Sequence, residues 1–165
     1  GAESVRSCFK VELTEENSEA LLRGISLLSD TRHSHVYGRI EHIAPNCRSR
    51  QHFKSILEEK SRSSFEGKIY VHPEAQKTEA YQHSQSLLLS DEAISYAKPN
   101  LEIFADDVKA SHGATVSQPD KEALFYLRSR GLSLEEARLL LVEGFCGEIL
   151  SCLPFASLQD LVWKK

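Results

Sequence analysis

Apolar and polar residues alternate through short segments in the first two thirds of the chain. Between residues 65 and 72, phenylalanine, glycine, isoleucine and valine share one face, and charged residues, tyrosine and histidine share the other. This two-residue period is typical of a β-strand with one buried side. The pattern predicts strands over residues 7–13, 20–27, 35–43, 51–57, 65–72, 76–89 and 101–106.

The breaks between these segments contain turn-forming residues, among them Pro45-Asn46, Pro73 and Lys98-Pro99-Asn100. Most strand starts are spaced by roughly 14 residues, so that two strands would form a unit of about 25–30 residues, as in repeat architectures. The sequence contains no Asn-Gly or Asp-Gly pair, which disfavours tight antiparallel hairpins. The pattern alone is compatible with either a β-sandwich or a stack of solenoid rungs.

The period changes to that of a helix after Pro119. Acidic residues at 120 and 122 favour a helix start, and Gly131 is expected to end that helix. Ser133 and Glu136 have the spacing of a capping box, which predicts the start of a second helix. We therefore divide the chain into a β region, residues 1–118, and a helical region, residues 119–165. Within the latter, we expect Pro154 to end the second helix and leucine and valine residues over 158–162 to form a short third one.

Composition excludes several classes of protein. A hydrophobic fraction of 41% and a charged fraction of 27% are ordinary for a globular domain. No apolar run is long enough to span a membrane, and the N-terminus lacks the pattern of a signal peptide. Residues 73–165 hold 9 Lys/Arg against 14 Asp/Glu, the wrong sign for a nucleic-acid partner. Methionine is absent, so we expect the chain to be a piece of a longer protein.

The four cysteines are not spaced like a zinc site or a redox pair. Cys8, Cys47, Cys146 and Cys152 include no C-x-x-C pair, and we expect free thiols that are mostly buried. The sequence also lacks the glycine-rich loops that hold nucleotide phosphates, so we do not expect it to bind ATP.

His112 is the main candidate for chemistry. Its neighbours Ser111 and Gly113 are small, and a neutral imidazole can ligate iron, copper or zinc, or transfer protons near neutral pH. We expect it at a corner between a strand and a helix. The alternative is a structural histidine that is hydrogen-bonded in that corner.

Two other polar clusters have simpler interpretations. Asp106 and Asp107 are consecutive and would point to opposite faces of a strand, so we expect a structural role, with one carboxylate capping a corner. His33, His35 and His42 are compatible with a surface metal site, but a solvated polar face is the favoured interpretation.

Four segments resemble the SufB/SufD family of iron–sulfur cluster assembly scaffolds, and its SufD branch in particular. They are LEIFADDVK (101–109), SHGATV (111–116), LFYLRSRG (124–131) and FEGKIYVHPEAQKTEAYQHSQSLLLS (65–90). The resemblance favours the solenoid. It implies a mainly β fold, a right-handed parallel β-helix made of the last rungs of a longer protein, followed by a short C-terminal α-helical region.

The resemblance also implies a function. The chain would be a non-catalytic cytoplasmic scaffold subunit that pairs with SufB and docks SufC, an ABC-type ATPase, through residues 120–152. His112 would help to build a transient iron–sulfur cluster at the SufB interface and is the candidate metal ligand. The chain alone would bind no cofactor stably, and in isolation it could form a homodimer. SufD proteins commonly have cysteine two residues before this histidine, but this chain has Ala110, which cannot supply a thiolate.

Tyr126, Arg128 and Arg130 are the candidate partner-binding residues, because aromatic and arginine side chains are frequent interface anchors. Leu124 and Phe125 are expected to cover the end of the solenoid. Two other functions stay open: a β-helix enzyme acting on carbohydrate, and an interaction domain with no role in cluster assembly.

Overall fold

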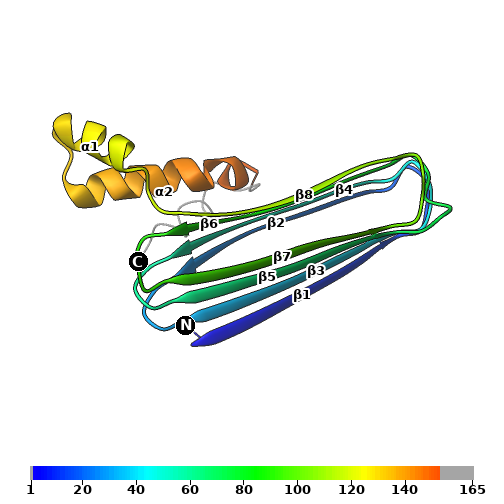
Figure 1. Cartoon of the computed structure of the whole chain (residues 1–165), viewed down its shortest axis with the longest axis horizontal. Helices are drawn as coiled ribbons and strands as arrows, with labels where there is room; N and C mark the ends of the chain where they lie inside the picture. The colour runs from blue at the N-terminus through cyan, green and yellow to red at the C-terminus, as the bar shows by residue number, and fades with distance from the viewer. Residues whose placement is uncertain (1, 153–165) are drawn as a thin grey trace.

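The computed structural model describes residues 2–152, within which eight β-strands precede two α-helices (Figure 1). The helices are α1 (Lys121–Ser129) and α2 (Leu134–Leu150). The strands, in chain order, are β1 (Ser4–Leu13), β2 (Glu19–Leu28), β3 (His33–His42), β4 (Arg48–Leu57), β5 (Arg62–Val71), β6 (Thr78–Leu88), β7 (Ile94–Ile103) and β8 (Val108–Ser117).

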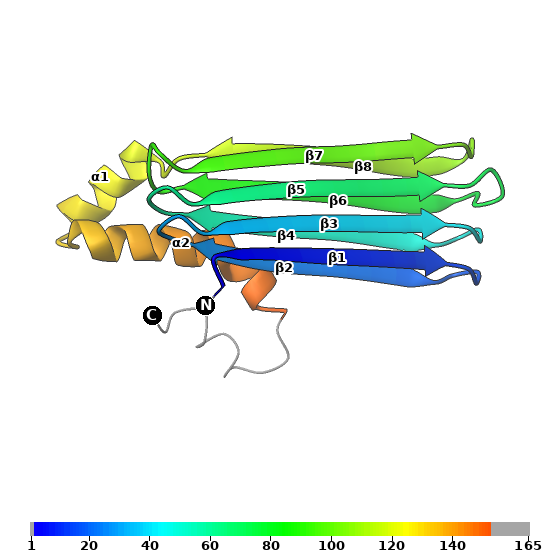
Figure 2. The same cartoon turned by 90° about the horizontal axis from the view of Figure 1, so that it is seen from below.

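The strands form two parallel sheets, one of the odd-numbered strands β1-β3-β5-β7 and one of the even-numbered strands β2-β4-β6-β8 (Figure 2). Consecutive strands therefore belong to different sheets, and each pair makes one rung of a solenoid. In the odd-numbered sheet, Ser4 pairs with His33, His33 with Arg62, and Arg62 with Ile94, at spacings of 29, 29 and 32 residues. This topology confirms the predicted parallel β-helix and excludes the β-sandwich.

Each of the seven predicted strands corresponds to an observed one, but the end of the β region differs from the prediction. β8 was not predicted, because its sequence VKASHGATVS has little apolar alternation. β7 begins at Ile94 and runs through the predicted break at Lys98-Pro99-Asn100. Pro99 pairs with Gly67 on one side of β7, and among residues 2–152 no strand pairs on the other side. An edge strand tolerates a proline, because the missing N–H faces away from the sheet.

The interior of the solenoid contains polar as well as apolar side chains. Ile40, Ile69 and Val71 are fully buried. Ser95 lies within hydrogen-bonding distance of Ser63, at 3.0 Å, and of Ser86 in the facing sheet, at 2.7 Å. These hydroxyl pairs satisfy polar groups that would be costly to bury alone.

In the first three rungs, the corner between the two strands is built on a left-handed residue. Asn17, Asn46 and Lys77 have φ angles of 62°, 60° and 58°, a region that asparagine enters more readily than most residues. The next corner contains Asp106 and Asp107, both exposed. Asp107 supports it through its backbone: its carbonyl accepts from the Lys77 N–H at 2.6 Å, and its N–H donates to the side chain of Gln76 at 2.9 Å. The predicted capping by a carboxylate is therefore replaced by backbone bonds.

The helix α2 packs on the outer face of the even-numbered sheet. Its Val142, Cys146 and Leu150 form a buried cluster with Ile56 and Leu87 of the strands. The predicted capping box is confirmed, since Ser133 and Glu136 exchange hydrogen bonds at the start of α2. Pro154 and the predicted third helix lie outside the described residues.

The predicted cover over the end of the solenoid is wrong. α1 contains no buried residue, and Phe125 is 76% exposed. Because α2 packs on the flank of the sheet, the helical pair extends past the strand ends (Figure 1) and not over β7 and β8 (Figure 2). We call β7 and β8 the final rung.

All four cysteines are free. Cys47 and Cys146 are buried as predicted, whereas Cys8 and Cys152 are exposed. Neither described helix is long and apolar enough to cross a membrane.

Candidate functional site on the final rung

His112 lies in the middle of β8, not at the predicted corner. It is in register with Gln82 of β6, which is in register with Gln51 of β4 and, through it, with Leu22 of β2. Gln51 and Gln82 are 1% and 2% exposed, so this inner column of four residues faces the solenoid interior. His112 is nevertheless exposed, because no strand in the described part of the chain stacks on β8.

The two buried amides below His112 have no hydrogen-bond partner within residues 2–152. A glycine stands opposite each of them. A Cβ at Gly38 would lie 2.7 Å from Oε1 of Gln51, and one at Gly67 would collide with the side chain of Gln82. The glycines of the facing strands therefore leave room for the two amides, whose nitrogen and oxygen atoms stay unpaired within residues 2–152.

Ala110 lies on the same side of β8 as His112 and packs against a buried cluster that includes Ile69 and Val71. Its methyl group offers no ligand where a cysteine would offer a thiolate. Among the described residues, no group of three or more His, Cys, Asp or Glu side chains could hold a metal ion. His112 is therefore not part of a preformed metal site of that kind within residues 2–152.

The three histidines near residue 40 also do not converge. His33 is exposed, and Nδ1 of His35 lies 2.6 Å from the hydroxyl of Ser64. His42 is fully buried, with Nε2 at 2.8 Å from the hydroxyl of Ser49. We predicted that these histidines lie on a solvated polar face. This prediction holds for His33 but is wrong for His42.

A groove of about 610 Å³ is lined by residues of β4, β6 and β8, with His112 among them, and by Glu148 of α2. Within it, the rings of His52 and His83 stack with centroids 5.6 Å apart and 17° between their planes. Nε2 of His52 lies 3.0 Å from Oε1 of Gln85, and its Nδ1 lies 3.6 Å from a carboxylate oxygen of Glu148 on α2. The groove thus joins strand and helix side chains.

Burial lowers the pKa of His83 below its ordinary value, and His52 and Lys54 act in the same direction. A carboxylate nearby, Glu148, opposes them. The sequence interpretation missed this histidine pair. The one signal was the spacing of 31 residues between His52 and His83, which matches the register of β4 with β6.

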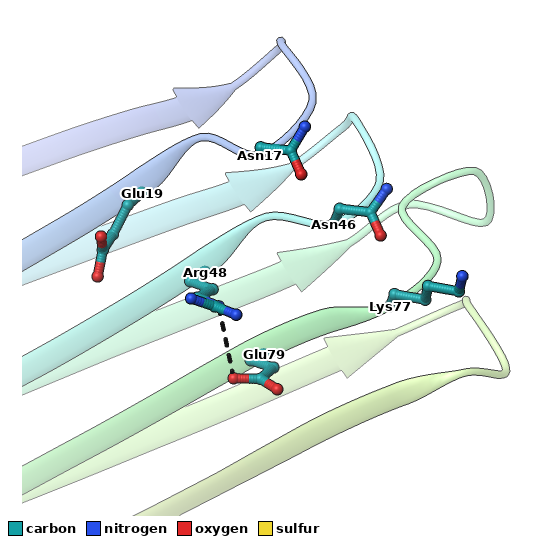
Figure 3. A pocket seen from close by; sticks show the side chains of 6 residues that line it. All are labelled: Asn17, Glu19, Asn46, Arg48, Lys77 and Glu79. Carbon is teal, nitrogen blue, oxygen red and sulfur yellow. Dashed lines mark ion pairs between the residues drawn. The ribbon is translucent and has the colours of Figure 1, made fainter.

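A smaller cavity of about 330 Å³ lies at the corner that carries the left-handed residues (Figure 3). Charges alternate from strand to strand beside it: Glu19, Arg48 and Glu79 are in register, and Arg48 lies 3.7 Å from Glu79. None of the candidate residues from the sequence lines this cavity, whose full lining is Asn17, Glu19, Asn46, Arg48, Lys77 and Glu79.

The sequence matches the family model of the SUF system FeS cluster assembly, SufBD core domain, over residues 1–145. The chain belongs to the SufBD family. An iron–sulfur cluster assembly SufBD family protein of Synechocystis is 40% identical over 159 residues, which cover 96% of this chain and 35% of that protein. The iron–sulfur cluster assembly protein SufD of Escherichia coli is 35% identical over 162 residues, which cover 98% of this chain and 38% of SufD. The chloroplastic protein ABCI7 of Arabidopsis thaliana is 42% identical over 117 residues, covering 70% of this chain and 25% of that protein. The chain thus spans well under half the length of these curated relatives.

The candidate partner residues of this SufD-like SufBD chain lie on α1 and at its C-cap, apart from the strand that carries His112. Tyr126, Arg128 and Arg130 are all exposed. The guanidinium carbon of Arg130 lies 5.1 Å from the centre of the Tyr126 ring, within the range of a cation–π contact. The helix therefore presents an aromatic and basic surface next to the exposed ring of Phe125.

Proposed function

We propose that this SufBD chain is part of a non-catalytic scaffold subunit that pairs with a SufB-type subunit through its final rung. The observation that supports this best is that His112 is exposed at the uncovered end of its column, above the two buried amides of Gln51 and Gln82. Imidazole is a good ligand for iron, and here the iron–sulfur cluster would be cargo and not a resident cofactor. The cluster would form transiently at the interface.

The final rung has the features of a pairing surface. Within residues 2–152, the outer edges of β7 and β8 are unpaired, and unpaired edges are templates for strand addition. Exposed apolar side chains occur on or next to the same rung, at Ile103, Phe104 and Val116. A partner that stacks here buries these groups and brings its own thiolates towards His112. It would supply the soft ligand that Ala110 cannot.

We further propose that α1 and α2 dock a SufC-type ATPase. The sequence contains no phosphate-binding loop, so ATP hydrolysis would belong to that partner. Tyr126 and Arg130 form an exposed aromatic and basic pair of the kind that anchors protein interfaces.

Anaerobic reconstitution with SufB-type and SufC-type partners tests the role of His112. His112→Ala should abolish most cluster formation while the complex still co-purifies. The matched control is His33→Ala, which removes an exposed histidine from β3. Full cluster formation by His112→Ala would favour an interaction domain with no cluster role.

Co-purification tests the role of α1. The double change Tyr126→Ala and Arg130→Ala should release the SufC-type partner and retain the SufB-type one. Lys121→Ala, at another exposed position of α1, serves as the control. Unchanged retention of both partners by the double variant would contradict docking through this surface.

A further inference from the structure

Arg50 of β4 carries a guanidinium group that pairs with no carboxylate in the described part of the chain. Its carbon lies 5.5 Å from the centre of the Tyr81 ring, within the range of a cation–π contact. On the same face of β4, two residues earlier, Arg48 lies 3.7 Å from a carboxylate oxygen of Glu79. The N–H donors of Arg50 thus remain without an acceptor, and the side chain lines the groove between the strands and α2.

Two further donors in the same groove have no acceptor within residues 2–152. The ring nitrogens of His83 make no hydrogen bond there, although the ring stacks on that of His52. The exposed hydroxyl of Ser111 on β8 makes none either. Gly113 is in register with His83, and because a Cβ there would already lie 3.4 Å from the ring, a larger side chain would cover its edge. Donors from three neighbouring strands therefore line one groove.

The charges around His83 are mainly positive. Burial lowers the pKa of His83 most, His52 and Lys54 lower it further, and Glu148 opposes them less strongly. The carboxylate of Glu148 is already paired, since its oxygens lie 3.6 Å from Nδ1 of His52 and 3.4 Å from Nζ of Lys54. The groove therefore holds one paired anion and the unpaired cation of Arg50, a balance that favours an anionic ligand.

We propose that this groove binds a tetrahedral oxyanion, phosphate or sulfate, through the Arg50 guanidinium, the His83 ring and the Ser111 hydroxyl. Such an anion offers acceptor oxygens in several directions, which suits donors on three strands, whereas a carboxylate offers them in one plane. The planar guanidinium binds phosphate through two N–H groups. The three donors lie on the opposite side of their strands from the inner column of His112, so this site does not depend on the proposed pairing through the final rung.

The source of the oxyanion is either a free inorganic ion or the end group of a small molecule. A groove of about 610 Å³ has the size of a small-molecule site and can hold an organic group next to the anion. The two sources share the same recognition chemistry and differ only in the contacts of that organic group.

Binding should be linked to proton uptake. Burial and the neighbouring cations disfavour the protonated His83 ring, and an oxyanion beside the ring favours it. The affinity should therefore increase as the pH is lowered. The other titratable or charged groups around the groove are Arg50, His52 and Lys54 of β4, Tyr81 of β6, His112 of β8 and Glu148 of α2.

NMR of the full wild-type chain, labelled with ¹⁵N-histidine, tests the proposal at constant ionic strength with inorganic phosphate, sulfate and acetate as probes. The His83 signals are assigned by their loss in His83→Phe, which keeps a ring to stack on His52. Phosphate and sulfate should shift the His83 ring signals saturably and leave those of the exposed His33 unchanged, and acetate should bind several-fold more weakly. Shifts that do not saturate, or equal binding of acetate, would overturn the proposal.

Two variants on the same face of β4 test the role of the unpaired guanidinium. Arg50→Gln should weaken sulfate binding by about tenfold or more, because it removes hydrogen bonds between charged groups. Arg48→Gln is the matched control, since Arg48 is equally exposed on that face but does not line the groove. It should bind sulfate nearly as well as the wild type. Equal losses in the two variants would overturn the proposal.

The pH dependence tests the role of His83. Sulfate keeps its charge across the neutral range, so any proton taken up belongs to the protein. Its affinity for the wild type should increase several-fold between about pH 8 and about pH 6, and most of this increase should be lost in His83→Phe. An affinity independent of pH in the wild type would overturn the role of His83.

Phenyl phosphate distinguishes the two sources. Tighter binding of phenyl phosphate than of inorganic phosphate, lost in Arg50→Gln, would support a site for a small molecule that ends in phosphate. Equal affinities, both lost in that variant, would support a site for the free ion. Failure of both to bind would overturn the proposal, whatever the outcome of cluster reconstitution with His112→Ala.

Discussion

The ammonium group of Lys54 lies 2.7 Å from the backbone carbonyl oxygen of Phe145, so a lysine of β4 joins the even-numbered sheet to α2. The Lys54 side chain is only 7% exposed, and its Nζ also lies 3.4 Å from a carboxylate oxygen of Glu148. A buried charge is costly without partners, and these partners both belong to α2. Lys54 therefore adds a polar attachment to the apolar cluster that packs α2 on the flank of the solenoid.

Replacing Lys54 should weaken the attachment of α2. We expect Lys54→Ala to lower the free energy of unfolding by about 1–3 kcal/mol, measured by urea denaturation, because it removes a buried charged hydrogen bond. Glu148→Gln is the control: the Glu148 side chain is 67% exposed, and exposed ion pairs contribute less than about 1 kcal/mol. Equal losses for the two variants would contradict this account.

The cysteines should differ sharply in reactivity. Burial raises the pKa of the Cys146 thiol to about 11, although Lys54 acts in the opposite direction. The thiolate is the reactive form, so iodoacetamide at pH 8 should modify Cys8 and Cys152 in the native protein. Cys47 and Cys146 should react only in denaturant, as mass spectrometry of the peptides would show. Fast modification of Cys146 by iodoacetamide in the native protein would contradict the packing of α2 on the sheet.

The existence of strands could be predicted from alternation alone, but β8 could not. The segment around His112 is small and polar, and it becomes a strand because every residue from Thr78 to Leu87 of β6 has a partner in β8. A capping box, by contrast, is local, and Ser133 with Glu136 was sufficient to place the start of α2.

The inner column and the stacked histidines depend on register, which the sequence does not reveal. Rung spacings vary between 29 and 32 residues, and a slip of one residue moves a side chain to the other face. For this reason Gln82 could not be placed beneath His112, nor His52 beside His83, before the corners were known. The exposure of Phe125 likewise follows from the docking of α2 and not from the sequence of α1.

The glycine that faces Gln82 should be sensitive to substitution. A Cβ at Gly67 would collide with the Gln82 side chain and with the ring of Phe65. We expect Gly67→Ala to lower the free energy of unfolding by about 1–3 kcal/mol through overpacking. In α2, a Cβ at Gly144 meets nothing within 4 Å, so Gly144→Ala should raise stability by about 0.5–1 kcal/mol. Urea denaturation of both variants tests whether the free energy of unfolding changes in opposite directions. An unchanged free energy of unfolding in Gly67→Ala would contradict the close contact between Gly67 and the Gln82 side chain.

The free energy of unfolding should decrease as the pH is lowered from neutrality to about 4, because of His42. This side chain is fully buried, with its ring nitrogens 2.8 Å from the hydroxyl of Ser49 and 3.4 Å from that of Thr78. Burial lowers its pKa from 6.5 to about 4. Between these values the unfolded chain binds a proton that the folded chain does not, so the stabilising contribution is complete above about pH 6.5 and is lost as the pH falls to about 4.

The lowered pKa of His42 corresponds to a loss of about 3 kcal/mol in the free energy of unfolding over this pH range. His83, whose pKa is also lowered by burial, contributes in the same direction. Urea denaturation at several pH values should therefore show a flatter pH dependence for His42→Gln than for the wild type. His33→Gln, which removes an exposed histidine, should retain the wild-type slope. If His42→Gln kept that slope as well, the proton uptake on unfolding would have to come from other groups, and the neutral state of the buried imidazole would be refuted.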